Sequence, residues 1–145
     1  MFLKEEGGWV QRETSSQDRR GPAAADPWVA IVDDHDSLRS SLARAFRLEG
    51  VRVESFASAE DFLNRTSSSA PVCLVLDMQL PLMSGHELLH RLEQDPAPVP
   101  PTVFISGHDD LLAALDGCCA PYGRLRKPFD VNVLLALVMP LTRVD

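Results

Sequence analysis

Two short runs of apolar residues each stop abruptly at an aspartate. Residues 28–32 read Trp-Val-Ala-Ile-Val and are followed by Asp33, and residues 72–76 read Val-Cys-Leu-Val-Leu and are followed by Asp77. Continuous apolar runs of this length are typical of strands that are buried on both faces, as in parallel sheets. The chain is therefore expected to fold around a buried parallel sheet.

Amphipathic stretches separate the apolar runs. Leu38, Leu42 and Phe46 recur four residues apart with arginines between them, and Gly50 closes the segment, as expected for a helix with one apolar face. Helices are expected over 37–49, 59–65 and 85–93, from about 109 and from 130, and further strands over 51–56, 102–105 and 124–126. This alternation, with right-handed crossovers, predicts an α/β fold with a doubly wound five-stranded parallel sheet and helices on both faces.

Length and charge limit the classes of protein to which the chain can belong. Its 145 residues suit one domain with one core. With 14 Lys and Arg against 21 Asp and Glu, the formal net charge is −7, which disfavours direct binding of nucleic acid. No apolar run is long enough to span a membrane, and three cysteines fit neither a disulfide framework nor a metal spacing. We therefore expect a cytoplasmic protein with no membrane partner.

The first 27 residues differ in character from the rest of the chain. They are polar, contain Gly7-Gly8 and Thr14-Ser15-Ser16, and show no sustained period. We therefore expect residues 1–27 to form a flexible N-terminal extension and residues 28–145 to form the folded domain.

Reactive side chains follow four of the predicted strands at the same end. Asp33 and Asp34 follow the first strand, Asp77 the third, Ser106 the fourth and Lys127 the fifth. The carboxyl ends of parallel strands meet at one edge of the sheet, where doubly wound folds bind their ligands. Carboxylates gathered there repel each other and favour a bound cation, and oxygen ligands without His or Cys suit Mg²⁺. The sequence therefore predicts a magnesium site.

Asp77 is the expected nucleophile of this site, because a carboxylate can form an acyl phosphate. Phosphoryl transfer also requires neutralisation of charge on the phosphoryl oxygens, for which the Lys127 ammonium and the Ser106 hydroxyl are candidates. Each residue taken alone has a structural explanation, since an aspartate at a strand end is commonly a cap or turn residue. Only their shared position favours the chemical interpretation.

Four segments together resemble the receiver domain of bacterial two-component response regulators, most closely the FixJ type. They are Val-Ala-Ile-Val-Asp-Asp at 29–34, Leu-Val-Leu-Asp-Met-Gln-Leu-Pro-Leu-Met-Ser-Gly at 74–85, Phe-Ile-Ser-Gly-His at 104–108 and Arg-Lys-Pro-Phe-Asp at 126–130. The resemblance covers residues 28–139 and implies the CheY-like fold with strand order 2-1-3-4-5.

The resemblance also implies a role for each site residue and a class of partner. Asp77 resembles the phosphoacceptor, Asp33 and Asp34 the acidic metal pair, the backbone carbonyl of Gln79 a further Mg²⁺ ligand, Ser106 the hydroxyl that couples phosphorylation to movement, and Lys127 the phosphate-binding residue. The Lys127–Pro128 peptide bond is expected to be cis. The phosphoryl donor is expected to be a sensor histidine kinase or a phosphotransfer protein.

The region before Lys127 departs from the family pattern. Gly117 and Pro121 are expected to shorten the fourth helix to about two turns. The family places an aromatic switch residue three positions before the lysine, where this chain has Arg124. Either the switch is altered or absent, or Tyr122 occupies the same space through a looser loop.

The last predicted helix is apolar almost all round before it reaches Pro140. Val131, Leu134, Leu135 and Val138 are part of this surface. A helix of this kind is normally buried on every side, so we predict that it docks a second copy of the chain or a partner protein. The alternative is that the N-terminal extension covers it.

The histidines do not form a metal-binding pattern. His35 adjoins the acidic pair, but no second His or Cys lies at a suitable spacing, so we interpret it as a solvated loop residue. His86, His90 and His108 receive the same interpretation. Cys73, inside an apolar run, is expected in the core.

The sequence thus predicts a phosphoacceptor module that catalyses its own phosphoryl transfer and hydrolysis, without being an enzyme for outside substrates. It is expected to signal through protein contacts, because the chain ends about where the family's domain ends. Two alternatives stay open. One is a constitutive interaction module uncoupled from phosphorylation, and the other is the receiver fragment of a DNA-binding transcription regulator.

Overall fold

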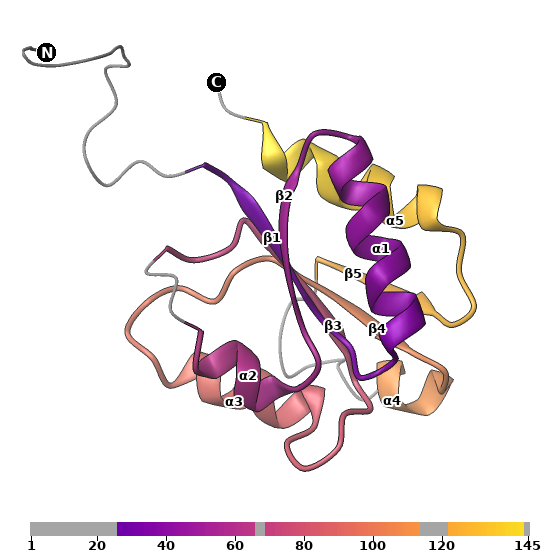
Figure 1. The fold of residues 1–145 in the computed structure, drawn as a ribbon. Helices are drawn as coiled ribbons and strands as arrows, with labels where there is room; N and C mark the ends of the chain where they lie inside the picture. Colours follow the sequence, from indigo (N-terminus) through magenta and orange to yellow (C-terminus); the bar gives the residue numbers. More distant parts are fainter. Residues whose placement is uncertain (1–25, 66–68, 114–121, 144–145) are drawn as a thin grey trace, which may run out of the picture.

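Five parallel strands form a sheet in the order β2-β1-β3-β4-β5 in the computed structural model, which describes residues 26–65, 69–113 and 122–143 (Figure 1). The strands are β1 (Trp28–Val32), β2 (Arg52–Phe56), β3 (Cys73–Asp77), β4 (Thr102–Ser106) and β5 (Gly123–Arg126). Each neighbouring pair is parallel. The predicted doubly wound α/β sheet and its strand order are therefore confirmed.

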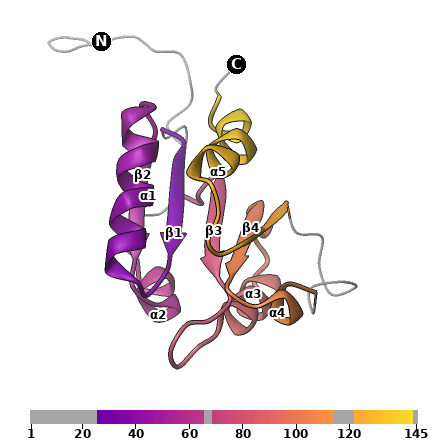
Figure 2. The same ribbon diagram turned by 90° about the vertical axis from the view of Figure 1, so that its right-hand side faces the viewer.

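Helices cover both faces of the sheet. They are α1 (Asp36–Leu48), α2 (Ala59–Leu63), α3 (Gly85–Glu93), α4 (Asp109–Ala113) and α5 (Val131–Val138), followed by the short 3-10 helix η1 (Met139–Thr142). In Figure 2, α1 and α5 lie in front of the sheet and contact each other. Both α2 and α3 lie on the opposite face (Figure 1). The expected shortening of the fourth helix depends on residues 114–121, which lie outside the described residues.

Alternate residues of each central strand enter different halves of the core. Val29 and Ile31 pack with α1 and α5, whereas Trp28 and Ala30 pack with α2 and α3. Both halves are apolar because side chains of a strand alternate between the two faces and these strands are apolar at successive positions. Cys73 is fully buried, as predicted, and burial raises the pKa of its thiol to about 12.

Local sequence signals fix where several helices begin and end. The Ser58 hydroxyl caps α2, and Ser84 caps α3 in a reciprocal capping box with Glu87. Asp130 caps α5 by accepting the Asn132 N–H. Gly50, just past α1, has a φ of 83°, a left-handed conformation that glycine adopts without strain.

The last helix corrects part of the docking prediction. Leu134 and Val138 are fully buried in the core of this domain, so these two side chains are not available to a partner. Val131 and Leu135 are partly buried against the same core, and Val133, another apolar residue of this helix, is 47% exposed. Docking through the open side of α5 stays a prediction. The N-terminal extension invoked as an alternative cover lies almost entirely outside the described residues.

No helix within the described ranges is both long and apolar enough to cross a bilayer.

Candidate metal and phosphoacceptor site

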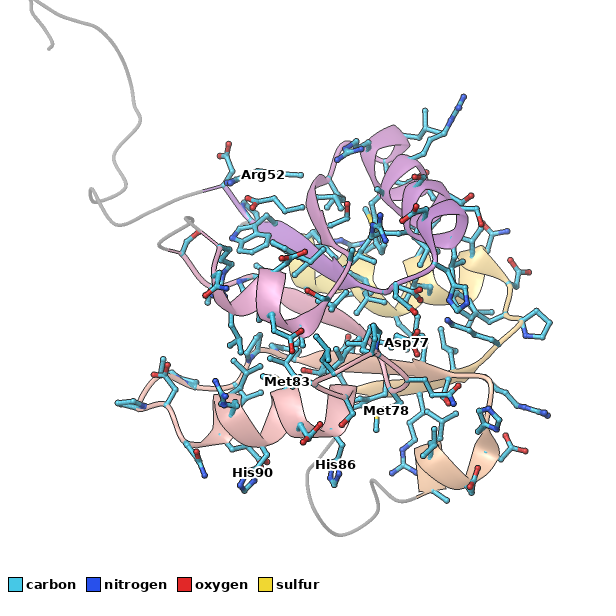
Figure 3. All side chains as sticks on the ribbon, turned by 60° about the horizontal axis from the view of Figure 1, so that its bottom comes forward. Arg52, Asp77, Met78, Met83, His86 and His90 are labelled. Atoms are coloured by element: carbon cyan, nitrogen blue, oxygen red, sulfur yellow. The ribbon has the colours of Figure 1, made fainter. Side chains whose placement is uncertain are left out.

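Four of the predicted site residues meet at the carboxyl edge of the sheet. Asp77 and Ser106 are the last residues of β3 and β4, and Asp33 and Lys127 directly follow β1 and β5. Asp33 and Ser106 are fully buried, and Asp77 is 1% exposed. In Figure 3, Asp77 lies among the packed side chains at this edge of the sheet. A buried carboxylate is unfavourable unless a positive charge or a hydrogen-bond donor faces it, so the donors around these acids determine what the site can do.

The ammonium of Lys127 bridges two of the acids. Its Nζ lies 3.0 Å from Oδ2 of Asp33 and 3.2 Å from Oδ2 of Asp77. Burial alone lowers the pKa of Lys127, but the hydrogen bonds to the two carboxylates and their charges outweigh it and raise this pKa above its ordinary value. Lys127 is therefore a fixed positive charge at neutral pH.

The Asp77 carboxylate is held from both sides. Its Oδ1 accepts the backbone N–H of Gln79 at 2.9 Å, while its Oδ2 faces Lys127. Burial raises the pKa of Asp77, and the charge of Asp33 adds to this effect. The Gln79 N–H and Lys127 oppose it, but the pKa stays above its ordinary value. The carboxylate is thus buried and held by two donors, an arrangement that a carboxylate nucleophile could use.

A divalent cation fits the remaining charge. Asp33, Asp34, Asp77 and His35 each offer one ligand atom, and these atoms all lie within 4.8 Å of one another. Three carboxylates against the one ammonium of Lys127 leave two negative charges. The side chain of Asp34 is 36% exposed, so the site is open to solvent on that side. Oxygen donors with access to water suit Mg²⁺, which keeps several waters when bound.

Ser106 connects the acid site to β5. Its Oγ accepts the backbone N–H of His108 at 3.0 Å, and its carbonyl accepts the backbone N–H of Lys127 at 2.8 Å. The Lys127–Pro128 peptide bond is cis, as predicted. Movement of the Ser106 main chain would therefore be transmitted directly to Lys127.

Sequence reasoning missed the position of His35. The residue is 66% exposed, as a solvated loop residue should be, but its Nδ1 lies 3.2 Å from Oδ1 of Asp33 and 3.5 Å from Oδ1 of Asp34. Its place between a strand-ending acid pair and a helix was the available signal, because the chain turns back there. His86 and His90 project from α3 away from Asp77 (Figure 3).

The position expected for an aromatic switch carries an exposed arginine. Arg124 lies on β5 opposite Phe104 of β4. Tyr122 lies two residues earlier, 39% exposed, with its backbone N–H bonded to the Thr102 carbonyl at 2.9 Å. Tyr122 is therefore farther along the sheet from Ser106 than Arg124 is.

The fold and the site together define a doubly wound α/β domain with an acidic cluster at the carboxyl edge of its sheet. A family described as the response regulator receiver domain matches residues 29–139. The chain belongs to this family of regulatory receiver domains of two-component systems.

Several known proteins are similar to the chain. The C4-dicarboxylate transport transcriptional regulatory protein DctR of Rhodobacter capsulatus is 34% identical over 113 residues, which is 77% of this chain and 57% of DctR. The response regulator protein TmoT of Ectopseudomonas mendocina is 32% identical over 139 residues, 95% of this chain and 60% of TmoT. The chain thus spans a little over half the length of these relatives.

A solved structure shares the same fold. The response regulator receiver protein from Burkholderia phymatum superposes with a TM-score of 0.68 at 29% identity, covering 82% of this chain and 97% of that one. The FixJ type within the family stays a prediction.

Proposed function

We propose that the chain is a phosphoacceptor receiver that takes a phosphoryl group onto Asp77 in a Mg²⁺-dependent reaction. The observation that carries this proposal is the Lys127 ammonium, 3.0 Å from Asp33 and 3.2 Å from Asp77 at the carboxyl edge of the sheet. A largely buried lysine, with its side chain 20% exposed, between two buried acids is costly as a purely structural element. It is useful where an anionic group is to be received.

The transfer step needs only groups that the site and the donor supply. A carboxylate oxygen of Asp77 attacks the phosphorus of a phosphohistidine, the P–O bond forms, and the P–N bond breaks with its electron pair going to the departing imidazole. Hydrolysis reverses the modification when water attacks the phosphorus and the P–O bond to Asp77 breaks. The domain acts on its own carboxylate and needs no site for an outside substrate.

Asp33, Asp34 and Asp77 would hold the cation, together with the backbone carbonyl of Gln79. Bound Mg²⁺ supplies positive charge to the phosphoryl oxygens. Asp34 is the most exposed of the three acids, so it is suited to hold a cation that retains water. The Gln79 N–H donates to Oδ1 of Asp77 at 2.9 Å, so the main chain that would supply this carbonyl runs beside the acids.

Lys127 and Ser106 would then respond to the new phosphoryl group. The ammonium exchanges its bond to Oδ2 of Asp77 for a bond to a phosphoryl oxygen. Because Ser106 Oγ already accepts the His108 N–H, its own proton can be donated to another phosphoryl oxygen. The backbone bond between Ser106 and Lys127 would couple the two responses.

The proposed donor is a sensor histidine kinase or phosphotransfer protein in the cytoplasm, and the proposed type of regulator is FixJ-like. Residues 1–27 are proposed to be an extension outside the receiver, since the family match begins at residue 29. DctR is a transcriptional regulatory protein, which supports the alternative that this receiver belongs to a DNA-binding regulator. Its own net charge of −7 argues against direct contact with DNA.

The test is incubation with acetyl phosphate and Mg²⁺, followed by intact mass spectrometry. The wild type should gain the mass of one phosphoryl group, and Asp77→Asn should gain none. Asp109→Asn is the matched control, because the Asp109 side chain is 76% exposed and pairs only loosely with Arg126, at 3.4 Å. Unmodified wild-type protein, or a modified Asp77→Asn variant, would refute the proposal.

A second candidate is an interaction module that binds its partner regardless of phosphorylation. Arg124 at the expected aromatic position favours it, because an arginine that is exposed on β5 does not replace an aromatic ring that moves between exposed and buried positions. The two candidates differ in partner affinity before and after acetyl phosphate treatment. Equal affinities with Asp77 fully modified would favour the second candidate.

A further inference from the structure

We infer that His35 is a specificity-determining ligand of the acidic site, one that shifts its preference from Mg²⁺ toward divalent cations that bind nitrogen, such as Ni²⁺ and Co²⁺. The inference rests on the proposed metal site and adds a residue to it. It concerns which cation the site takes up, and therefore which metals compete with Mg²⁺ for the same carboxylates.

The backbone holds His35 over the acids. Its N–H donates to Oδ1 of Asp33 at 2.8 Å, and its carbonyl accepts the Arg39 N–H at 2.9 Å in the first turn of α1. These two bonds fix the main chain on each side of the side chain. The ring follows, and its Nδ1 lies 3.2 Å from Oδ1 of Asp33 and 3.5 Å from Oδ1 of Asp34.

The ring nitrogen shares its surroundings with all three carboxylates. The ligand atoms of Asp33, Asp34, His35 and Asp77 lie within 4.8 Å of one another, so one cation can reach them together. The Asp33 carboxylate is fully buried while the His35 side chain is 66% exposed. The imidazole is thus accessible from solvent, as a ligand for an incoming hydrated cation must be.

An imidazole ligand at this position would change which cations the site prefers. Mg²⁺ is a hard cation that binds oxygen and gains little from an imidazole. Imidazole suits Zn, Cu, Fe and Ni, and affinities for mixed N and O sites rise from Mn²⁺ through Co²⁺ and Ni²⁺ to Cu²⁺. Adding one nitrogen to three carboxylates should therefore strengthen Ni²⁺ binding far more than Mg²⁺ binding. Without a metal, the same ring can donate Nδ1–H to the two acids.

The experiment is calorimetric titration with MgCl₂ and NiCl₂ of the whole chain carrying His86→Gln and His90→Gln. These two residues lie four apart on α3 and are both exposed, a spacing that can chelate transition metals by itself. In this background His35→Gln is compared with His108→Gln, an exposed histidine that follows Ser106 by two residues. Absorption of bound Co²⁺ reports nitrogen coordination independently.

We expect His35→Gln to weaken Ni²⁺ binding at least about tenfold and Mg²⁺ binding less than about threefold, and to change the Co²⁺ spectrum. His108→Gln should alter none of these. Equal losses for both metals, or unchanged Ni²⁺ affinity and Co²⁺ spectrum, would overturn the inference. Asp34→Asn separates this failure from that of the proposed function. If Asp34→Asn leaves Mg²⁺ affinity unchanged, the acidic site itself is wrongly assigned. If Asp34→Asn weakens Mg²⁺ binding while His35→Gln changes neither Ni²⁺ affinity nor the Co²⁺ spectrum, only the role of His35 is rejected.

Discussion

The α-carbon of Gly85 faces the backbone carbonyl of Asp77 with no room for a side chain. A Cβ at this position would overlap the carbonyl oxygen of Asp77 and crowd the α-carbon of Met78. Gly85 is the first residue of α3 and is buried, and its N–H donates to the Met78 carbonyl at 3.3 Å. The start of α3 therefore packs directly against the main chain of the proposed phosphoacceptor.

Gly85→Ala should consequently disturb both stability and phosphorylation. Because the neighbouring atoms belong to the backbone, the added methyl can be accommodated only if β3 or α3 shifts, and we expect the free energy of unfolding to fall by about 1–3 kcal/mol. Urea unfolding and acetyl phosphate labelling measure the two effects. Gly107→Ala is the control, since a Cβ there meets nothing within 4 Å. Equal stabilities of the two variants would contradict the packing argument.

Asp77→Asn should stabilise the metal-free protein at neutral pH. Burial raises the pKa of Asp77 in the folded state, so its contribution to stability is fully present below its unfolded pKa of about 3.9 and is lost as pH rises through the folded value. Above that value the ionised carboxylate opposes folding. Urea unfolding in a chelator should show Asp77→Asn more stable than wild type at pH 7, with the difference shrinking toward pH 4. If Asp77→Asn were less stable than wild type at pH 7, the ionised Asp77 carboxylate would favour folding, which contradicts the prediction.

Lys127→Met should destabilise the metal-free protein and make it more dependent on Mg²⁺. It leaves the buried Asp33 and Asp77 without their shared cation, which should cost about 1–3 kcal/mol. The raised pKa of Lys127 means that this stabilisation is present below about pH 10.5 and is lost as pH rises through the folded value. Adding Mg²⁺ should narrow the difference at pH 7.

Arg126→Met serves as the matched control for Lys127. Arg126 is the neighbouring residue and is exposed, and its 3.4 Å contact with Asp109 is a surface ion pair of little expected energy. Thermal unfolding with and without Mg²⁺ compares the two variants. If Mg²⁺ stabilises wild type and Lys127→Met equally, the Lys127 ammonium does not offset the negative charge of the metal site.

Leu82→Gly should stabilise the protein. Leu82 has a φ of 64° and is 91% exposed, so it occupies a left-handed conformation that is unfavourable for a side chain while burying almost nothing. Relief of this strain should raise the free energy of unfolding by up to about 1 kcal/mol. Leu48→Gly is the control and should lower the free energy of unfolding. Leu48 ends α1 and is 75% exposed, and glycine weakens a helix by about 0.5–1 kcal/mol. A loss of stability in Leu82→Gly would show that its loop makes contacts that the exposure conceals.

Elements set by buried runs and by caps could be predicted closely from the sequence. The strand expected at 28–32 and the helix expected at 85–93 have the observed bounds. The first is a continuous apolar run that ends at an acid. The second begins at Ser84, whose capping box with Glu87 is a local signal. The shared edge of the site followed from topology, since parallel strands bring their carboxyl ends together.

Features that depend on loop geometry or on packing partners could not be predicted. The sequence places His35 beside the acid pair, but the approach of its ring to the carboxylates depends on the geometry of the turn into α1. The apolar composition of α5 indicated a helix without a polar face, but only packing against the sheet and α1 determines that Leu134 and Val138 point inward. The sequence assigned these two residues to an interface, but this packing places them in the core.

The position of Asp77 on β3 determines which parts of the molecule can respond to its modification. This central strand has hydrogen-bonded neighbours on both sides, and moving it would break two ladders at once. Within the described ranges β5 pairs only with β4. The proposed phosphoryl transfer would therefore take place on a central strand, and the structural response is expected at the edge of the sheet. Hydrogen exchange should leave the amides of β3 unchanged after modification and alter those of β5.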